Sequence, residues 1–412
     1  MRIAGLMLIN VACVVLTWQA GTLVTMLIAQ AACLLSAGLL LKSDQLSGHR
    51  VVAAAVGFPC LLLGFALIIT LTGTTDVADI ETTLAASYQP DRADLLAGSG
   101  SILGIMAAVL IIAGCGIQAG WFPFHLISGD LFEHSPASTS MFLALTQRAQ
   151  ALLIIGRIGT AMAGFEGTWQ LVLLILGVAS ALACAVLVSR CESLRLLSGH
   201  AWLLHGGVLA VGLAIMIAEP DTANSGNSVA ATSGADEAAW QMLTARETVL
   251  LMFIVSGSAL CGVLACEEFL RLPDRRVDFL DDLAGLGRQS PLVAASLAIP
   301  LLTFISIPPL PGFWSLVFLT ANAFLPGNES NTSPVLVPSL LVLLALFAVV
   351  VGMLLLASRI VYVMSLVYFH EPVRRLAASG GMLSLATAAL ASVVLATAGL
   401  LPGRLLQLLH SL

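Results

Sequence analysis

Long runs of apolar residues alternate with short polar segments along almost the whole chain. Eleven of these runs are long enough, at about 20 residues each, to cross roughly 30 Å of hydrocarbon as helices. Their approximate limits are 3–18, 21–41, 51–72, 98–122, 138–159, 168–189, 197–217, 248–266, 291–325, 333–357 and 379–400. The pattern therefore predicts an all-α, polytopic membrane protein.

Two of the predicted spans contain helix breakers where an apolar helix would otherwise continue. The fourth span has a break near 118–125 that contains Pro123, and the ninth has a break near 305–313 that contains Pro308 and Pro309. Irregular backbone is costly in a bilayer unless it is buried in protein or lines a polar cavity. Two broken helices at matching places of two halves are typical of secondary transporters.

The breaks suggest how the chain is divided. We expect a first five-helix unit over 1–160, a second over 168–357 and a C-terminal helix over 358–412. Because five is odd, the second unit would be inverted relative to the first. Segment 219–246 is poor in large apolar residues and is expected to be a flexible loop, and an acidic loop is expected to run to about residue 95.

Basic residues orient the predicted spans. If the eleven spans alternate in direction, the face with the N-terminus carries twelve of the 17 basic residues, the other face carries four, and Arg148 lies inside a span. Lys and Arg are retained on the cytoplasmic side of membranes. We therefore expect a multi-pass protein of the cell inner membrane, with its N-terminus in the cytoplasm and its C-terminus outside, in the periplasm.

Composition excludes several classes of function. The 412 residues are 59% hydrophobic and only 10% charged, which differs strongly from soluble domains. No basic patch, phosphate loop, dinucleotide fingerprint, nucleophile motif or metal-ligand spacing is present, and the eight cysteines form no close-set pair. The sequence thus predicts no catalytic residue, cofactor, metal or nucleic-acid partner, and redox chemistry would belong to another polypeptide.

An ionisable residue inside a predicted span is a candidate for function, because a charge at the bilayer centre is costly unless it is hydrated or paired. Arg148 is the strongest candidate. Since an arginine stays protonated, it can attract or gate ions but cannot pass a proton on. The alternative is a structural clamp on Asp130, on Glu133 or on a helix end.

Other polar residues in the predicted spans could extend a proton path. His125, His200 and His205 can titrate near neutral pH, and each is either a proton relay or a packing residue. His200 and His205 are five residues apart and do not share a helix face well. Gln30 and Gln118 are neutral residues that can hold water or bond another helix, but they cannot carry charge.

Several of these residues belong to motifs that occur in the order found in one known family. The matching residues are Gln118, Pro123-Phe124-His125-Leu126, Asp130, Pro136, Phe142-Leu143, Arg148, Arg157, Arg195-Leu196-Leu197, Gly206, 282–288, Ile307-Pro308-Pro309, Gly312-Phe313, 358–361 and Glu371-Pro372. Over most of its length the chain resembles the antiporter-like membrane subunits of respiratory complex I, closest to subunit N. That family fold has fourteen helices, with broken seventh and twelfth helices, and this chain looks like the last eleven.

The resemblance implies a function and a set of partners. The family couples NADH:quinone electron transfer to proton translocation, and this chain would be a non-catalytic membrane subunit of such an NADH-quinone oxidoreductase. Its expected partners are the other membrane subunits of a complex I-like assembly and the lipid bilayer. Binding of quinone to this subunit is not expected.

The chain departs from the family at the positions that carry its proton path. In the family these are a glutamate in the fifth helix and lysines in the seventh, eighth and twelfth helices. The aligned residues here are Gln30, Gln118, Arg148 and Leu316. The family's histidine in the tenth helix falls on Leu204, and His205 is the next residue.

Three interpretations follow. The first is an ion-conducting subunit with a rewired path through Gln118, Arg148, His125 and either His200 or His205. The second is a non-conducting scaffold that keeps the fold and the partner contacts, with a leucine-filled centre around Leu316. The third is an antiporter-like subunit of another assembly, either a cation/proton antiporter or an inorganic-carbon uptake system.

Overall fold

The computed structural model describes residues 2–41, 48–87, 99–162, 164–218, 243–271, 279–324, 336–372, 377–378 and 381–401. The elements are α1 (Arg2–Gln19), α2 (Leu23–Leu40), α3 (Gly48–Thr72), α4 (Val77–Ser87), α5 (Ser99–Ala119), α6 (His125–His134), α7 (Ala137–Ala161), α8 (Glu166–Val188), α9 (Leu194–Ala218), α10 (Ala245–Phe269), β1 (Leu270–Arg271), η5 (Leu280–Leu283), α11 (Leu286–Gln289), α12 (Pro291–Phe304), α13 (Pro311–Phe324), α14 (Leu336–Phe369), β2 (Ala377–Ala378) and α15 (Met382–Leu400).

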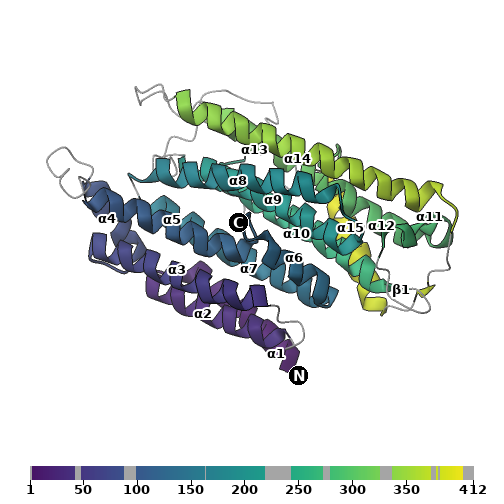
Figure 1. Cartoon of the computed structure of the whole chain (residues 1–412), viewed down its shortest axis with the longest axis horizontal. Coiled ribbons are helices and arrows are strands. Elements are labelled where there is room, and N and C mark those ends of the chain that lie inside the picture. Colours follow the sequence, from purple (N-terminus) through teal and green to yellow (C-terminus); the bar gives the residue numbers. More distant parts are fainter. Residues whose placement is uncertain are drawn as a thin grey trace, which may run out of the picture.

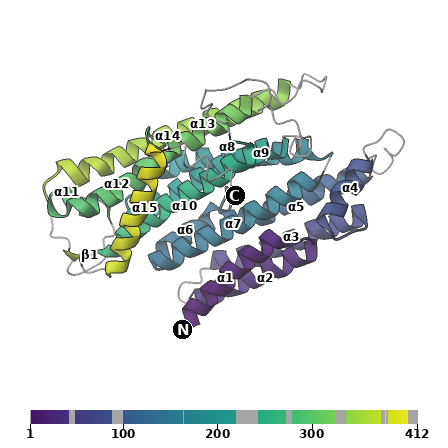
Figure 2. The same cartoon turned by 180° about the vertical axis from the view of Figure 1, so that it is seen from behind.

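The predicted all-α class is confirmed, since the strands in the described ranges are one antiparallel pair of two-residue strands, β1 and β2. Long helices run side by side in a slab, with α1 to α3 along one edge and α14 along the opposite edge (Figure 1). Seen from behind, α15 crosses obliquely over the green helices of the second half (Figure 2). It contacts α10 and α12.

All eleven predicted spans are helical, the ninth as the broken pair α12 and α13. Eight helices in the described part of the chain are long and apolar enough to cross a membrane, and shorter apolar helices lie at Ile3–Gln19, Val56–Thr72 and Pro291–Phe304. The chain is therefore a multi-pass membrane protein. The limits from hydropathy lie within a few residues of most helix ends, because the apolar runs end where the polar turns begin.

Contacts at the two ends of the bundle agree with spans that alternate in direction. At the end of the bundle where α8 leads into α9, Leu280 N donates to Glu192 O at 2.8 Å and Gly285 N donates to Leu366 O at 2.9 Å. At the opposite end, Thr22 forms an isolated antiparallel bridge with Asp76. Segments that an alternating topology would place at the same end of the bundle thus contact one another.

The acidic loop that we expected up to about residue 95 is wrong over its first part, which forms α4. Val77, Ile80 and Leu84 recur at helical spacing and are buried, and the Asp76 carboxylate accepts a hydrogen bond from Ala78 N at the helix start. The helix was missed because its apolar face is only three residues long. Residues 88–98 lie outside the described ranges.

Two expected boundaries differ from helix ends in the structure. The loop expected over 219–246 overlaps α10, which begins at Ala245 behind a capping box formed by Thr244 and Glu247; 219–242 lie outside the described residues. Helix α14 continues to Phe369, so the boundary expected at 357 falls inside it. The division into two inverted units stays a prediction.

Helix α9 lies at the centre of the bundle, and most of its side chains are buried. It approaches α8 closely at Gly207, where an added Cβ would come within 2.8 Å of Gly177 O. Glycine at this crossing lets the two backbones touch. The central position of α9 brings its polar residues next to both helix breaks.

Candidate functional site at the two helix breaks

The first break separates α5 from α6. Helix α5 ends at Ala119, and Gly120 then adopts a left-handed conformation, with φ of 70°, that a glycine takes without strain. The Trp121 side chain is fully buried, and Phe122 N donates to the Ser180 hydroxyl at 3.0 Å. A hydroxyl of α8 thus satisfies one backbone group that the break removes from the helix.

Arg148 reaches this break from α7 and is fully buried. Its Nε and Nη2 atoms donate to Ala119 O at 3.2 and 2.9 Å, and Nη1 donates to Trp202 O at 2.8 Å. The guanidinium carbon also lies 3.7 Å from the centre of the Trp202 ring. Ala119 is the last residue of α5, so its carbonyl has no partner within the helix and carries the negative end of the helix dipole.

Of the partners that the sequence left open for a clamp by Arg148, the structure shows a helix end, and a role of Arg148 in an ion path stays a prediction. Gly206 makes room for this arrangement, because a Cβ there would lie 2.8 Å from Arg148 Nη2 and 3.0 Å from Trp121 Cδ1. Sequence reasoning missed Trp202 as a partner. Its contributions are a ring face and a backbone carbonyl, and neither has a sequence signature.

The second break separates α12 from α13 and has a similar arrangement. His205, which is buried on α9, places Nε2 2.9 Å from Phe304 O, and Phe304 is the last residue of α12. Since a carbonyl only accepts, the hydrogen is on Nε2. Gly312 lies near the start of α13, where a Cβ would meet Thr303 O at 2.3 Å.

Both breaks are therefore closed in the same way. A buried nitrogen-bearing side chain from a neighbouring helix binds the last carbonyl before each break. The acceptors are Ala119 O for Arg148 and Phe304 O for His205. The sequence identified both donors and both breaks, but it did not connect them.

Gln30 and Gln118 behave differently. Gln30 on α2 is buried, and neither its amide nitrogen nor its amide oxygen has a hydrogen-bond partner among the described residues. The same holds for the amide of Gln118, near the end of α5. Burying a polar group without a partner costs about 1–3 kcal/mol. Buried amides of this kind are suited to holding water, and a role of Gln30 and Gln118 in a proton path stays a prediction.

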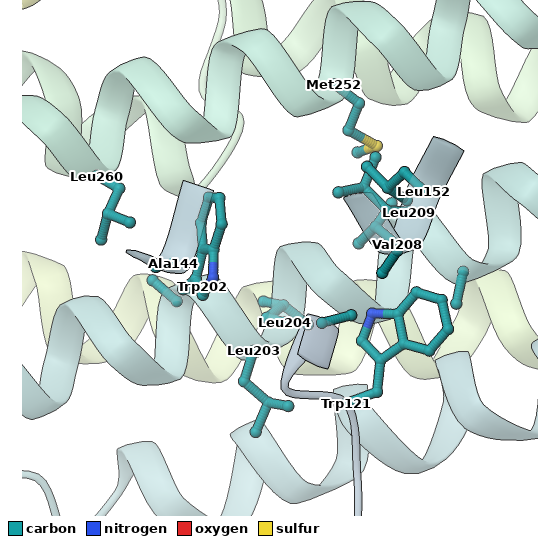
Figure 3. Packing of buried hydrophobic residues seen from close by; sticks show 14 of the residues in the cluster. Trp121, Ala144, Leu152, Trp202, Leu203, Leu204, Val208, Leu209, Met252 and Leu260 are labelled. Atoms are coloured by element: carbon teal, nitrogen blue, oxygen red, sulfur yellow. The ribbon is translucent and has the colours of Figure 1, made fainter. Parts of the chain in front are cut away.

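The interior around α9 is apolar. Figure 3 shows Trp121, Trp202, Leu204 and Leu209 together with other buried apolar side chains of this region. Leu204 is fully buried, and Leu316 on α13 packs against the same core. Two of the five positions at which the resemblance implies a titratable residue thus contain packed leucines.

A cavity of about 190 Å³ lies on the other side of the first break, between α6, α9 and the end of α8. Its polar lining consists of His125, Asp130 and Glu133 from α6 and His200 from α9. The His125 ring stacks on Phe122, with centroids 5.3 Å apart and planes at 17°. The structure thus brings His125 and His200 together in one cavity and places His205 at the second break.

An ion pair lies at the end of the bundle where α8 leads into α9. Arg195 Nε lies 2.5 Å from Glu267 Oε1, with 14% and 5% of the two side chains exposed, and Arg195 Nη1 donates to Ser135 O at 2.7 Å. The two residues connect α9, α10 and the end of α6, and nothing in the sequence indicated their pairing over 72 positions.

No group of three or more metal-ligating side chains occurs in the ranges that the structure describes. The buried donors at the breaks bind carbonyls, and the cavity holds two imidazoles and two carboxylates. Chemically, the arrangement can fix helix ends and bind protons or water.

A family of known proteins matches the first half of this chain. The family model described as NADH:quinone oxidoreductase/Mrp antiporter, TM, matches residues 9–218. NADH-quinone oxidoreductase subunit N of Sphingopyxis alaskensis is 27% identical over 288 residues, or 68% of this chain and 53% of the relative. Subunit N 2 of Acidobacterium capsulatum is 29% identical over 273 residues, or 64% and 47%. The chain spans about half the length of the curated relatives it matches.

Solved structures share the fold over nearly the whole chain. A chain of respiratory complex I from Thermus thermophilus matches with a TM-score of 0.67 and 22% identity, covering 98% of this chain and 78% of that one. A chain of the Mrp complex from Dietzia sp. matches with a TM-score of 0.71 and 18% identity, covering 98% and 74%. At these identities the likeness shows the fold alone.

Proposed function

Because the chain belongs to the NADH:quinone oxidoreductase/Mrp antiporter transmembrane family, we propose that it is an antiporter-like membrane subunit of a complex I-like assembly. In this assembly, quinone reduction would be coupled to proton transfer across the membrane. The observation that most supports this role is the pair of helix breaks, each closed by a buried side chain on the last helix carbonyl. The redox chemistry would lie on other subunits.

The partners follow from the same reasoning. Structures with this fold include chains of a respiratory complex I, an Mrp complex and an archaeal respiratory membrane complex, which favours assembly with other membrane subunits. We expect no quinone site and no nucleic-acid partner on this chain. The excess of basic residues on the N-terminal face favours an inner-membrane subunit with a cytoplasmic N-terminus.

The internal organisation is part of the proposal. The units 1–160 and 168–357 each have a broken helix as their fourth spanning member, and alternating topology makes them inverted. In each unit the break is closed by a side chain from another helix of the same unit: Arg148 of α7 in the first and His205 of α9 in the second. Arg148 also donates to the carbonyl of Trp202 on α9. The two units would therefore share α9 as a common support.

A second candidate function is a scaffold without a path of its own. The observation that favours it is the fixed guanidinium of Arg148, whose three hydrogen bonds all go to backbone carbonyls. An arginine held in this way does not release its proton. Together with the packed Leu204 and Leu316, it leaves few titratable groups between the breaks.

The test is proton uptake into liposomes that contain the purified parent complex, normalised to quinone reduced. We would compare wild type with Arg148→Gln and His125→Ala variants whose assembly is verified on native gels. A lower proton-to-quinone ratio with intact assembly supports participation in coupling. An unchanged ratio in both variants supports the scaffold. Recovery of cation-antiporter subunits in place of quinone-reducing subunits with the tagged chain would contradict both.

A further inference from the structure

Helix α15 contacts both halves of the second broken span, α12 and α13, as well as α10. Figure 2 shows it running obliquely over the helices of the second half. Its buried residues recur at helical spacing along one narrow face; they are Ala388, Ala391, Ser392, Leu395 and Gly399. Large apolar side chains on its other face are exposed. One continuous helix at the surface of the bundle is thus attached to both halves of a broken one.

The attachment to α12 satisfies a backbone group that the sequence of α12 leaves without a partner. Pro300 lies inside α12 and has no N–H, so the carbonyl of Ser296, four residues earlier, has no donor within its own helix. The Ser392 hydroxyl of α15 donates to this oxygen at 2.9 Å. The bond therefore connects α15 to α12 on the side of the break where α12 ends.

The attachment to α13 lies at the end of α15. The Trp314 indole on α13 donates from Nε1 to Gly399 O at 3.2 Å, and carbonyls in the last turn of a helix have no partner within it. Gly399 also packs on the connection between α12 and α13, because a Cβ there would come within 2.4 Å of Pro309 O and 2.8 Å of Leu310 Cα. The backbone of α15 therefore touches the break directly.

The connection between the two half-helices needs support from outside. Ser306 adopts a left-handed conformation with φ of 55°, which is unfavourable for a residue with a Cβ and persists only where the surroundings enforce it. On the inner side, His205 of α9 binds Phe304 O at the end of α12. On the other side, α15 packs against Pro309. The break is thus held between a central helix and a peripheral one.

We propose that α15 is a brace for the second break: it sets the angle between α12 and α13, and the broken span hinges when the contacts of Gly399 and Trp314 are lost. The first break has its ties from Arg148 of α7 and Ser180 of α8, which are both fully buried. Helix α15 instead has an exposed face, so it can shift without opening the core. The brace requires no proton transfer through the chain and so goes beyond the proposed function.

The test measures the position of α13 by double electron–electron resonance on the chain in lipid nanodiscs. Nitroxides are attached through genetically encoded keto amino acids at two exposed positions, Phe324 at the end of α13 and Leu171 on α8. Because α13 has 14 residues and is about 21 Å long, a rotation of about 10° at the break moves its far end by about 4 Å. Wild type should give one narrow distribution of distances.

Two variants weaken the brace to different degrees. Gly399→Ala places a methyl group against Pro309 O and should shift the mean distance by about 4 Å or broaden the distribution by a similar amount. Trp314→Phe removes the indole donor but keeps an aromatic ring beside Phe318, and should give a smaller change of the same kind. Gly381→Ala is the matched control at the other end of α15, since nothing lies within 4 Å of its added Cβ; it should match wild type.

A second label pair, Leu171 with Ile254 on α10, uses exposed positions that do not lie on the broken span. Its distance should stay the same in every protein, which separates hinging from general loosening. If Gly399→Ala does not fold, Trp314→Phe decides alone. The proposal is overturned if the folded variants keep the wild-type distribution for the first pair, if Gly381→Ala changes it as much, or if the second pair changes together with the first.

Discussion

At the scale of single residues, Arg148 links three helices at the first break. One guanidinium connects α7 to the end of α5 and to the middle of α9 through three hydrogen bonds. The sequence singled out this residue, because a charge inside an apolar run is costly. It could not identify the acceptors, since backbone carbonyls are present at every position and only the fold decides which of them lack a partner.

Replacing Arg148 with lysine should destabilise the protein although it keeps the charge. An ammonium group is a compact donor and cannot reproduce the planar fork that reaches two carbonyls while stacking on Trp202. We expect a loss of about 2–4 kcal/mol in the free energy of unfolding, measured by denaturant titration in lipid nanodiscs. Arg157→Lys is the matched control, because its main bond, to Trp18 O at 2.8 Å, suits a single donor; it should cost under about 1 kcal/mol. Equal losses would contradict the forked clamp.

Gly206→Ala should disturb the same clamp from the opposite side. The new methyl group would lie 2.8 Å from Arg148 Nη2 and 3.0 Å from Trp121 Cδ1, so the guanidinium or the indole must shift. A loss of about 1–3 kcal/mol is expected, with a lower midpoint in thermal denaturation. Gly38→Ala serves as the control, since no atom lies within 4 Å of its added Cβ; it should be neutral or stabilising. Unchanged stability of the Gly206→Ala protein would show that the space beside Arg148 and Trp121 accommodates a methyl group, and would contradict the tight packing at this position.

Cys191 gives a prediction about pH. Its thiol lies in the turn between α8 and α9 and donates to Ser193 O at 3.2 Å, and burial raises its pKa to about 11. Because the folded state keeps the proton that the unfolded chain loses near pH 9, this group lowers stability as pH rises from about 9 to 11. Maleimide labelling of Cys191 should stay slow at pH 8 in folded protein and become fast on unfolding. Rapid labelling of the folded protein would contradict the buried, protonated thiol.

At the scale of elements, the sequence predicted the spanning helices well and the short helices poorly. Each long apolar run became a helix because hydropathy alone decides whether about 20 residues cross a bilayer. Helices α4 and α6 were not foreseen. In α4 a three-residue apolar face is enough only because α3 and α7 lie against it, and α6 begins at His125 behind the break, where no capping side chain marks its start.

The start of α10 can be tested as an element. The Thr244 hydroxyl accepts from Glu247 N at 3.3 Å, and the Glu247 carboxylate accepts from Thr244 N at 2.8 Å. Thr244→Ala should cost about 1 kcal/mol, seen as faster amide hydrogen exchange over the first turn of α10. Thr160→Ala, which removes only a hydroxyl bound to its own helix at Gly156 O, should leave exchange in α10 unchanged. Unchanged exchange in Thr244→Ala would argue against the capping box.

At the scale of the whole molecule, the order of the spans and the two breaks could be read from the sequence. The family match over 9–218 covers the spans up to α9 and the first break. What could not be read is how distant segments meet. His200 and His205, only five residues apart on α9, serve different places: the cavity on one side and Phe304 O at the second break on the other. Pairing across the bundle depends on helix rotation, which hydropathy does not fix.

The central claim is that this chain takes part in coupling quinone reduction to proton transfer within a larger membrane assembly. The most direct test is the number of protons taken up per quinone reduced by the purified parent complex in liposomes, for wild type and for fully assembled Arg148→Gln. Removing the only buried guanidinium seen in the described residues should lower this ratio while the rate of quinone reduction is retained. The same ratio in wild type, in Arg148→Gln and in the His125→Ala variant, with assembly intact in all three, would contradict the claim and leave the chain as a scaffold.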